Sequence, residues 1–446
     1  MSGGARDTIF ALSSGRGRSA IAVVRMSGPE CSRIVLELTI GGLPPPRRAA
    51  VRAFRAPGSG ALIDRGLLLW FPKPHSATGE DVAEFHIHGG FAVQQALFRA
   101  LEGYDGVRPA EPGEFSRRAF ANGRLDLIQA EGLADLIAAE TEAQRRQALG
   151  QLEGTLSTLY QKWRRALLHV MADVEAEIDF SDQDLPFALG SQAMARLRDL
   201  EEEMGRHLMG GGRGELVREG VRVAIIGAPN AGKSSLLNAL MKRDVAIVHD
   251  APGTTRDVVE SRLALNGQLV TIMDTAGIRD TDDPVEREGV ARAEIAARLA
   301  DIVLVVLDGS DEGPVSPRIR DLVLDHAMVV INKADLCFHR PPKGFGAIET
   351  WVSAKTGEGM GPMIEAVSKS VDALIGAGDS VPLTRARHRA GIRDARAAIG
   401  RAISQDAVEL CAEDLRAASV ALGRLVGEIG AEEVLDRVFS EFCVGK

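Results

Sequence analysis

The sequence predicts a multidomain protein: an α+β N-terminal domain, a discontinuous α-helical bundle, and an inserted α/β domain with a doubly wound, mainly parallel sheet. Three observations predict this. Short strand-like runs alternate with Gly/Pro turns as far as residue 120, helical spacing of apolar residues fills two later blocks, and strands alternate with helices between those blocks. Each helical block has an apolar face, so we expect the two to pack as one bundle. The predicted domains are residues 1–120, 121–215, 216–378 and 379–446.

Composition narrows the class of protein. The 446 residues are 45% apolar, which is enough for buried cores, and the net charge of −9 argues against a protein that coats nucleic acid non-specifically. Four scattered cysteines without a CxxC pair argue against a disulfide framework or a zinc site. No signal-peptide pattern and no apolar run of about 18 residues is present. We therefore expect a soluble, cytoplasmic protein that does not bind membranes.

The N-terminal block carries strand-like runs at residues 20–26, 67–71 and 82–88. The stretch PPPRRAAVRAFRAPG, residues 44–58, reads as a basic, Pro-bounded loop or edge strand. Glu84, His86 and His88 alternate along the third run and therefore share one strand face. That pattern fits a metal site, or more simply a polar strand face beside a pocket.

The two helical blocks are defined by apolar stripes. Residues at spacings of three and four from Leu149 to Ile178 predict one long helix, which breaks at 179–190 and resumes as far as the glycines of 209–215. A second stripe runs from Cys411 to Ile429 and continues towards Phe439. Cys411 lies on this stripe and is expected in the core.

The α/β block carries a phosphate-binding motif. GAPNAGKSS, residues 227–235, matches G-x-x-x-x-G-K-[ST] between an apolar strand and a helix, where backbone N–H groups and the helix N-terminus bind phosphate. Lys233 would reach the β- and γ-phosphates, and Ser234 would ligate Mg²⁺.

Four further motifs follow in order. DTAG (274–277) ends a strand, and GTTRD (253–257) lies where a switch loop would bring Thr255 to the metal. NKAD (332–335) offers Asp335 to the N1–H and N2–H₂ edge of guanine, with Asn332 on the far side of the base, and SAK (353–355) adds a backbone amide. Five motifs in this order predict a P-loop GTPase that rejects ATP.

One position departs from Ras-like switches. The glutamine that orients the attacking water after DTAG is replaced by Ile278, which cannot hold a water molecule. Asn230 could coordinate a monovalent cation beside the phosphates in place of an arginine finger. Glu286 or Glu288 could orient the water, although glutamates in so acidic a stretch also fit a solvated surface.

The chain closely resembles the tRNA-modifying GTPase family MnmE (TrmE) over its whole length. The resemblance rests on TGEDVAEFHIHGG (78–90), on residues 108–137, on the GTPase motifs and on the ending FCVGK (442–446). It implies a folate-binding, dimerising N-terminal domain and G domains that pair around K⁺. It also implies wobble-uridine modification with a flavin-dependent MnmG-type partner in a heterotetramer, using 5-formyl- or methylene-tetrahydrofolate.

The resemblance also implies roles for individual residues, matched by motif. Glu286 would orient the water, and Lys233 and Cys443 would share in catalysis. The K⁺ ligands would be Asn230, His249, Ala251 and Thr254, and the Mg²⁺ ligands Ser234 and Thr255. The folate ligands would be Arg25, Glu84, Lys446 and Arg124, which stands where the family commonly has lysine. The GTP-binding residues would be Asn230, Ala231, Gly232, Lys233, Ser234, Ser235, His249, Asp250, Ala251, Pro252, Gly253, Thr254, Thr255, Asp274, Thr275, Ala276, Gly277, Asn332, Lys333, Asp335, Ser353, Ala354 and Lys355.

Other interpretations remain at this point. A ribosome-assembly GTPase could carry similar motifs, but it predicts an RNA-binding module such as a KH GXXG loop, and none follows the G domain. A scaffold with a vestigial G domain is disfavoured by the intact nucleotide-binding residues. Arg385, Arg389, Arg393 and Arg396 share one helical face, which fits either a solvated helix or contacts to tRNA phosphates.

Overall fold

The structure is a computed structural model. It describes residues 7–15, 17–179, 191–210, 212–242, 260–274, 294–311, 317, 320, 327–337, 348–376, 383–405, 407–429, 432–440, 442 and 444–445. The chain forms two compact units, each assembled from segments distant in sequence. The first contains residues 1–134, 151–187 and 406–446, and the second contains residues 135–150 and 188–405.

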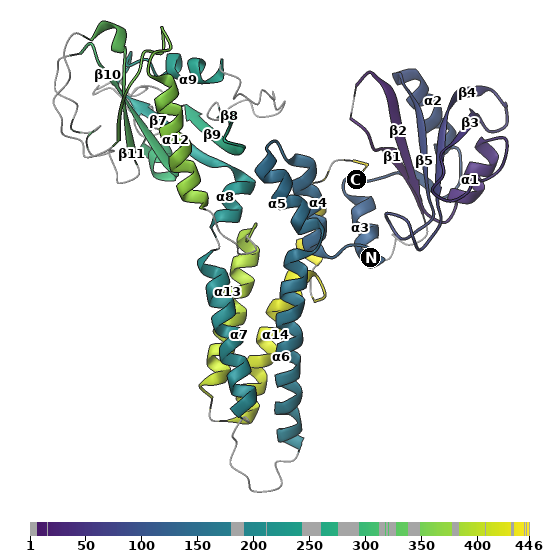
Figure 1. The fold of residues 1–446 in the computed structure, drawn as a ribbon. Helices are drawn as coiled ribbons and strands as arrows, with labels where there is room; N and C mark the ends of the chain where they lie inside the picture. The colour runs from purple at the N-terminus through teal and green to yellow at the C-terminus, as the bar shows by residue number, and fades with distance from the viewer. Residues whose placement is uncertain are drawn as a thin grey trace, which may run out of the picture. The chain divides into compact units, whose positions relative to one another are not determined.

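The first unit contains a six-stranded sheet with the strand order β3-β4-β5-β2-β1-β6, in which only β1 and β6 pair in parallel. Alternate strand residues face α1 and α2 and form a buried core with them, as the α+β prediction requires (Figure 1). The elements are β1 (Thr8–Leu12), β2 (Ser19–Ser27), α1 (Cys31–Leu38), β3 (Ala50–Arg55), β4 (Leu62–Phe71), β5 (Val82–Gly89), α2 (Phe91–Glu102) and β6 (Val107–Pro109).

Helices complete the first unit. Helix α6, which precedes the α/β segment, packs along helix α14, which follows it. Trp163 of α6 and Leu415 of α14 are buried. Cys411 is buried on α14, as predicted. The helices here are α3 (Glu114–Ala121), most of α4 (Leu127–Ala138), α6 (Thr155–Asp179), α14 (Val408–Val426) and α15 (Glu432–Ser440), whereas α5 (Glu142–Leu152) lies mainly in the second unit.

One helix prediction is wrong in detail. The stripe from Leu149 to Ile178 is divided between α5 and α6, because Gly154 adopts φ 87° and ends the first helix. The C-terminal stripe is likewise divided, since Gly427 at φ 87° caps α14 before α15 begins.

The second unit contains the predicted doubly wound sheet, with strand order β12-β11-β10-β7-β9-β8 and only the β8–β9 pair antiparallel. One face is covered by α9 and α12, and residues 294–300 cover the other, so each face has its own buried core. The elements are β7 (Val221–Gly227), α9 (Lys233–Met241), β8 (Glu260–Leu265), β9 (Gln268–Asp274), β10 (Ile302–Asp308), β11 (Ala327–Asn332), the 3₁₀ turn η2 (Ala334–Leu336), β12 (Ile348–Trp351) and α12 (Met360–Ile375).

Helices on both sides of this α/β segment pack on each other, while the packing of the two helical blocks as one bundle stays a prediction. These helices are α7 (Ser191–Met209) and α13 (Ala386–Ile403). The short helix α8 (Arg213–Glu219) leads into β7, so the predicted boundary between 215 and 216 falls inside a helix.

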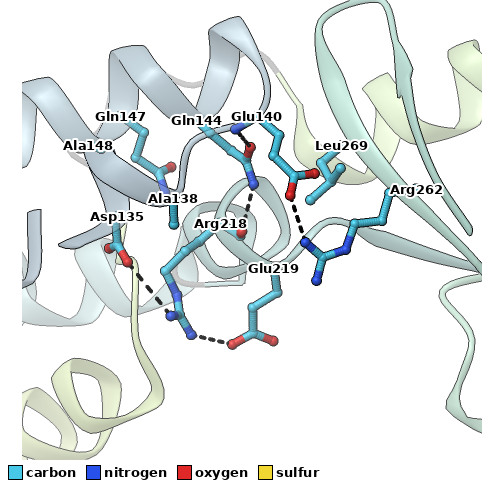
Figure 2. Close-up of a pocket in the computed structure, with 10 residues that line it drawn as sticks. All are labelled: Asp135, Ala138, Glu140, Gln144, Gln147, Ala148, Arg218, Glu219, Arg262 and Leu269. Atoms are coloured by element: carbon cyan, nitrogen blue, oxygen red, sulfur yellow. Dashed lines mark hydrogen bonds and ion pairs between the residues drawn. The ribbon is translucent and has the colours of Figure 1, made fainter. Parts of the chain in front are cut away.

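Residues 135–150 join the α/β segment around a polar cavity of about 320 Å³, shown in Figure 2. Thr141 and Gln144 form a capping box at the start of α5, because each side chain accepts the other's backbone N–H. The Gln144 amide also donates to the Arg218 carbonyl at 2.9 Å, and Arg262 on β8 pairs with Glu140 at 2.8 Å. The start of α5 is therefore fixed both to α8 and to the β8–β9 hairpin.

Within the described residues, we find no helix with the length and apolar content needed to span a bilayer.

Candidate functional site

The loop between β7 and α9 has a backbone that requires glycine at two positions. Gly227 lies at φ 156°, and a Cβ there would be 2.2 Å from the Val306 carbonyl oxygen. Gly232 lies at φ 90°, and a Cβ there would be 2.1 Å from Nδ2 of Asn332. Asn230, also left-handed at φ 59°, is exposed. Close backbone approach therefore shapes this loop, as a phosphate-binding loop needs.

Lys233 begins α9 and is 7% exposed. Its ammonium donates to the carbonyl oxygens of Gly227 at 3.1 Å and Ala228 at 3.0 Å, so the charge is held over the loop. Ser234 and Ser235 follow in the first turn of α9, and both are exposed. A cation and two hydroxyls thus sit at a helix N-terminus, which favours an anion.

Asn332 links this loop to the SAK motif. The side chain is 2% exposed, its amide donates to the Ala231 carbonyl at 2.9 Å, and its Oδ1 accepts the Ala354 N–H at 3.1 Å. The sequence predicts a contact from Asn332 to the guanine base, and this contact stays a prediction. What the structure adds is that Asn332 fixes the spacing between the phosphate loop and the predicted base-binding loop.

The other NKAD side chains are held by named partners. Asp335 accepts a hydrogen bond from the Ser353 hydroxyl at 2.6 Å, and Ser353 is fully buried. Lys333, left-handed at φ 62°, pairs with Asp308 at 2.5 Å. Although burial acts to raise the pKa of Asp308, hydrogen bonds from Lys333 and Ser310 lower it below its usual value. The hydrogen bond from Ser353 orients the carboxylate of Asp335. Lys355, in the SAK motif, is exposed.

These groups meet at one edge of the sheet. The phosphate loop follows β7, Asp308 ends β10, and Asn332 ends β11, and all three strands are parallel neighbours. Asp274 ends β9, whose register places it beside Ile225 of β7. Ligands of open α/β sheets bind outside the carboxyl ends of the strands, and the motif residues converge there.

Several predicted site residues lie outside the described residues. They are His249, Asp250, Ala251, Pro252, Gly253, Thr254, Thr255, Thr275, Ala276, Gly277, Glu286, Cys443 and Lys446.

A second group of predicted residues comes together in the first unit. Arg25 on β2 pairs in register with Glu84 on β5, and its guanidinium donates to one carboxylate oxygen at 2.8 and 3.0 Å. Both residues alternate with core positions, so they lie on the sheet face opposite α1 and α2. The Arg25 guanidinium also lies 5.9 Å from the centre of the Phe115 ring of α3.

The C-terminal tail reaches the same sheet. Val444 forms a bridge with Pro112, and the Ser13 hydroxyl donates to the Gly445 carbonyl at 2.8 Å. Gly445 adopts φ 101°, and a Cβ there would lie 2.1 Å from the Leu12 carbonyl oxygen, so this approach requires glycine. Leu12 is one residue along β1 from the partner of Arg25 in the β1–β2 register. The two ends of the chain therefore meet near the Arg25–Glu84 pair.

Arg124 is exposed, and its stem packs at Gly79. In the part of the chain that the structure describes, no group of three His, Cys, Asp or Glu side chains could hold a metal ion. Instead, the ring of His88 bonds Asp64 at 2.9 Å, and His86 lies 3.7 Å from Glu84.

Three arginines of the predicted row on α13 pair with acids inside the second unit. Arg385 bonds Asp135 at 2.8 Å, and Arg389 pairs with Glu215. Arg396 lies 3.4 Å from Glu201. These pairs favour a structural role for the row over a contact with phosphates.

Comparison with known proteins identifies the family of the chain. The family model described as "GTP-binding protein TrmE N-terminus" matches residues 8–124, and that of the MnmE helical domain matches residues 127–443. The chain belongs to the MnmE family. It is 48% identical over 441 residues to the tRNA modification GTPase MnmE of Paramagnetospirillum magneticum, covering 99% of this chain and 100% of that protein. It is 50% identical to the protein of the same name from Acidiphilium cryptum, covering 99% of each.

Among solved structures, a variant of Era from Aquifex aeolicus bound to GDP and AlF₄⁻ is 26% identical. The match covers 40% of this chain and 66% of that chain with a TM-score of 0.27, which is too low to compare folds.

Sequence reasoning missed the partners that hold the MnmE-type motifs in place. Asp308 and the bridging role of Asn332 are tertiary features, and the contact from Asn332 to Ala231 spans 101 positions in sequence. Of these features, only Asp308 could be recognised from local sequence, because it ends an apolar strand as Asn332 does.

Proposed function

We propose that this protein hydrolyses GTP and couples hydrolysis to tRNA modification, acting on C5 of the wobble uridine (position 34) of certain tRNAs. The product would be an aminomethyl or carboxymethylaminomethyl group, built with a folate-carried one-carbon unit and an MnmG-type, FAD-dependent partner. Membership of the MnmE family supports the tRNA role. The observation that carries the GTPase assignment is Asn332, which ties the phosphate loop to the SAK motif beside the oriented Asp335 carboxylate.

Guanine specificity would come from Asp335. A carboxylate accepts the paired N–H donors of guanine, which adenine lacks, and the bond from Ser353 keeps one oxygen directed. Lys233 would bind the β- and γ-phosphates. Mg²⁺, which neutralises charge on the phosphates when bound, would be held by Ser234, exposed in the first turn of α9, and by Thr255.

Hydrolysis without a switch glutamine requires substitutes. The exposed, left-handed Asn230 fits a monovalent cation site at the rim of the phosphate loop. K⁺ bound there, with His249, Ala251 and Thr254, would supply positive charge in place of an arginine finger. Glu286 would orient the water, and pairing of G domains in a homodimer would complete the site.

The folate site would use both ends of the chain. Arg25 suits the carboxylates of the folate tail, and Glu84 suits the N–H edge of a pterin. Lys446 and Cys443 would be the contribution of the C-terminal end, whose Gly445 carbonyl accepts the Ser13 hydroxyl, and Arg124, whose stem lies at Gly79, would be a further ligand. Folate would deliver the one-carbon unit, and the protein residues would orient it.

Two measurements test the GTPase assignment. Calorimetry should show binding of GTP but not ATP, and Asp335→Asn should shift preference to xanthine nucleotides because the pattern of donors and acceptors reverses. Turnover should be much faster in K⁺ than in Na⁺ at equal ionic strength. ATP binding as tight as GTP binding would refute the base assignment, and equal rates in both salts would refute the K⁺ site.

A further inference from the structure

An uncompensated row of arginines lies at one edge of the N-terminal sheet. Residues 38–63 contain four arginines and no aspartate or glutamate, in a chain whose net charge is −9. The strand order places β3 at the end of the sheet, and β4 adds a fifth, exposed arginine. We name these five residues the arginine edge: Arg47, Arg48, Arg52, Arg55 and Arg65.

The arginine edge differs in its partners from several arginines of this domain that pair with acids, although Arg99 likewise donates to a backbone carbonyl, that of Gln95. Arg33, Arg108 and Arg118 each pair with a carboxylate at 3.0 Å or less. Among the residues that the structure describes, no carboxylate forms an ion pair with any arginine of the edge, and the guanidinium groups of Arg47, Arg52 and Arg55 donate to backbone carbonyls. These acceptors are the carbonyl oxygens of His75, Val51, Gly41 and Gly60. A carbonyl orients a guanidinium but leaves its full positive charge for another partner.

The backbone beneath these side chains is fixed. The Arg47 N–H donates to the Trp70 carbonyl at 2.9 Å, and the Arg48 N–H donates to the Pro45 carbonyl at 3.1 Å. The β3–β4 register places Arg65 opposite Ala53 and Arg52 opposite Gly66, and it shifts between Phe54 and Arg55. The positive charges therefore lie on paired strands and an anchored loop, so little ordering would be needed on binding.

We propose that the arginine edge binds the phosphate backbone of the substrate tRNA, an inference that rests on the proposed function. Guanidinium groups form bidentate, charge-assisted hydrogen bonds with phosphate. Phosphate contacts position a nucleic acid without reading its sequence, which suits an enzyme whose specificity lies at one uridine. Charges on an edge strand can also serve only to prevent strand pairing between copies, but here an isolated bridge from Thr39 to Phe54 already occupies part of the free edge of β3.

The test is the salt dependence of tRNA binding by the full-length protein, measured by fluorescence anisotropy between 50 and 200 mM KCl. The test variant replaces Arg47, Arg48, Arg52 and Arg55 with glutamine. The matched control removes the same charge from exposed, acid-paired arginines: Arg33, Arg145, Arg146 and Arg416. The slope of log K against log [salt] is negative, and each single change at the edge should make it less steep by about 1. Over this range, wild-type affinity should fall on the order of 100-fold more than that of the fourfold variant.

The outcomes separate the two proposals. GTP turnover and melting temperature should be unchanged in both fourfold variants, and the control should keep the wild-type slope. If wild-type protein binds tRNA and the edge variant keeps its slope, or the control loses as much, the arginine edge is not the site. No binding of tRNA by wild-type protein would refute the tRNA role itself, and loss of binding only to anionic phospholipid vesicles would assign the edge to membranes and overturn the proposal.

Discussion

At the scale of single residues, Asn332 connects two loops that are far apart in sequence. Both of its polar groups are satisfied by backbone atoms in a buried position, so truncation leaves a carbonyl and an N–H unpaired. Gly232 is coupled to it, since any side chain at that position would meet the Asn332 amide. The spacing between phosphate and base pockets depends on this contact.

Asn332→Ala should therefore weaken GDP and GTP binding strongly. Two lost hydrogen bonds at about 1–1.5 kcal/mol each correspond to roughly 30- to 150-fold in affinity. Ser353→Ala removes the bond to Asp335 and the one that the Ser353 hydroxyl accepts from the Thr356 N–H, but it leaves the Asn332 bridge intact, so it should cost about tenfold or less. Titration calorimetry of both variants checks the order, and an Asn332→Ala affinity within threefold of wild type would show that the bridge does not set the geometry of the site.

At the scale of elements, apolar runs that end in a motif were predictable, whereas contacts between distant segments were not. The parallel strands β10 and β11 are apolar up to their last residue because both sheet faces are covered. The break at Gly154 was missed because the apolar period continues across it. The P-loop and NKAD motifs predict a nucleotide site from local sequence, but the register of Arg25 with Glu84 depends on strand pairing that local sequence does not encode.

The start of α5 gives a stability prediction. Gln144→Ala should destabilise the second unit by about 1–2 kcal/mol, since it removes half of the capping box and the bond to the Arg218 carbonyl. Arg146→Ala on the same helix removes only an exposed ion pair with Glu142 and should change stability by less than about 0.5 kcal/mol. Urea denaturation monitors both changes, and equal effects would contradict the anchoring role of Gln144.

The α7–α13 pair should be sensitive to acid. Burial, with a smaller effect of His388, lowers the pKa of His207 to about 4 from its ordinary value of 6.5. A depressed pKa means that the folded state binds fewer protons than the unfolded state, so stability is complete above about pH 6.5 and falls as the pH approaches 4. The loss should be on the order of 3 kcal/mol. In His207→Gln, the melting temperature should depend less on pH over this range. If its pH dependence were unchanged, His207 would not be the cause of the acid sensitivity.

At the scale of the whole molecule, the G domain is inserted in sequence between helices that pack on each other, and the chain's two ends meet at one sheet. This arrangement allows nucleotide hydrolysis and the C-terminal tail to be separated by mutation. Deleting residues 443–446 removes the bridge at Pro112 and the bond from Ser13, neither of which involves the nucleotide-binding motifs. The truncated protein should therefore hydrolyse GTP at the wild-type rate yet lose reduced-folate binding. Lost GTPase activity would instead assign the tail a structural role.

The central claim is that this GTPase acts in tRNA modification, and mass spectrometry of wobble uridines tests it most directly. Transfer RNA would be isolated from cells lacking the protein and from the same cells expressing wild-type protein, Lys233→Ala or the tail deletion. The account predicts unmodified C5 positions in the deletion strain, full modification with wild-type protein, and none with either variant. Wobble nucleosides that are identical with and without the protein would contradict the account.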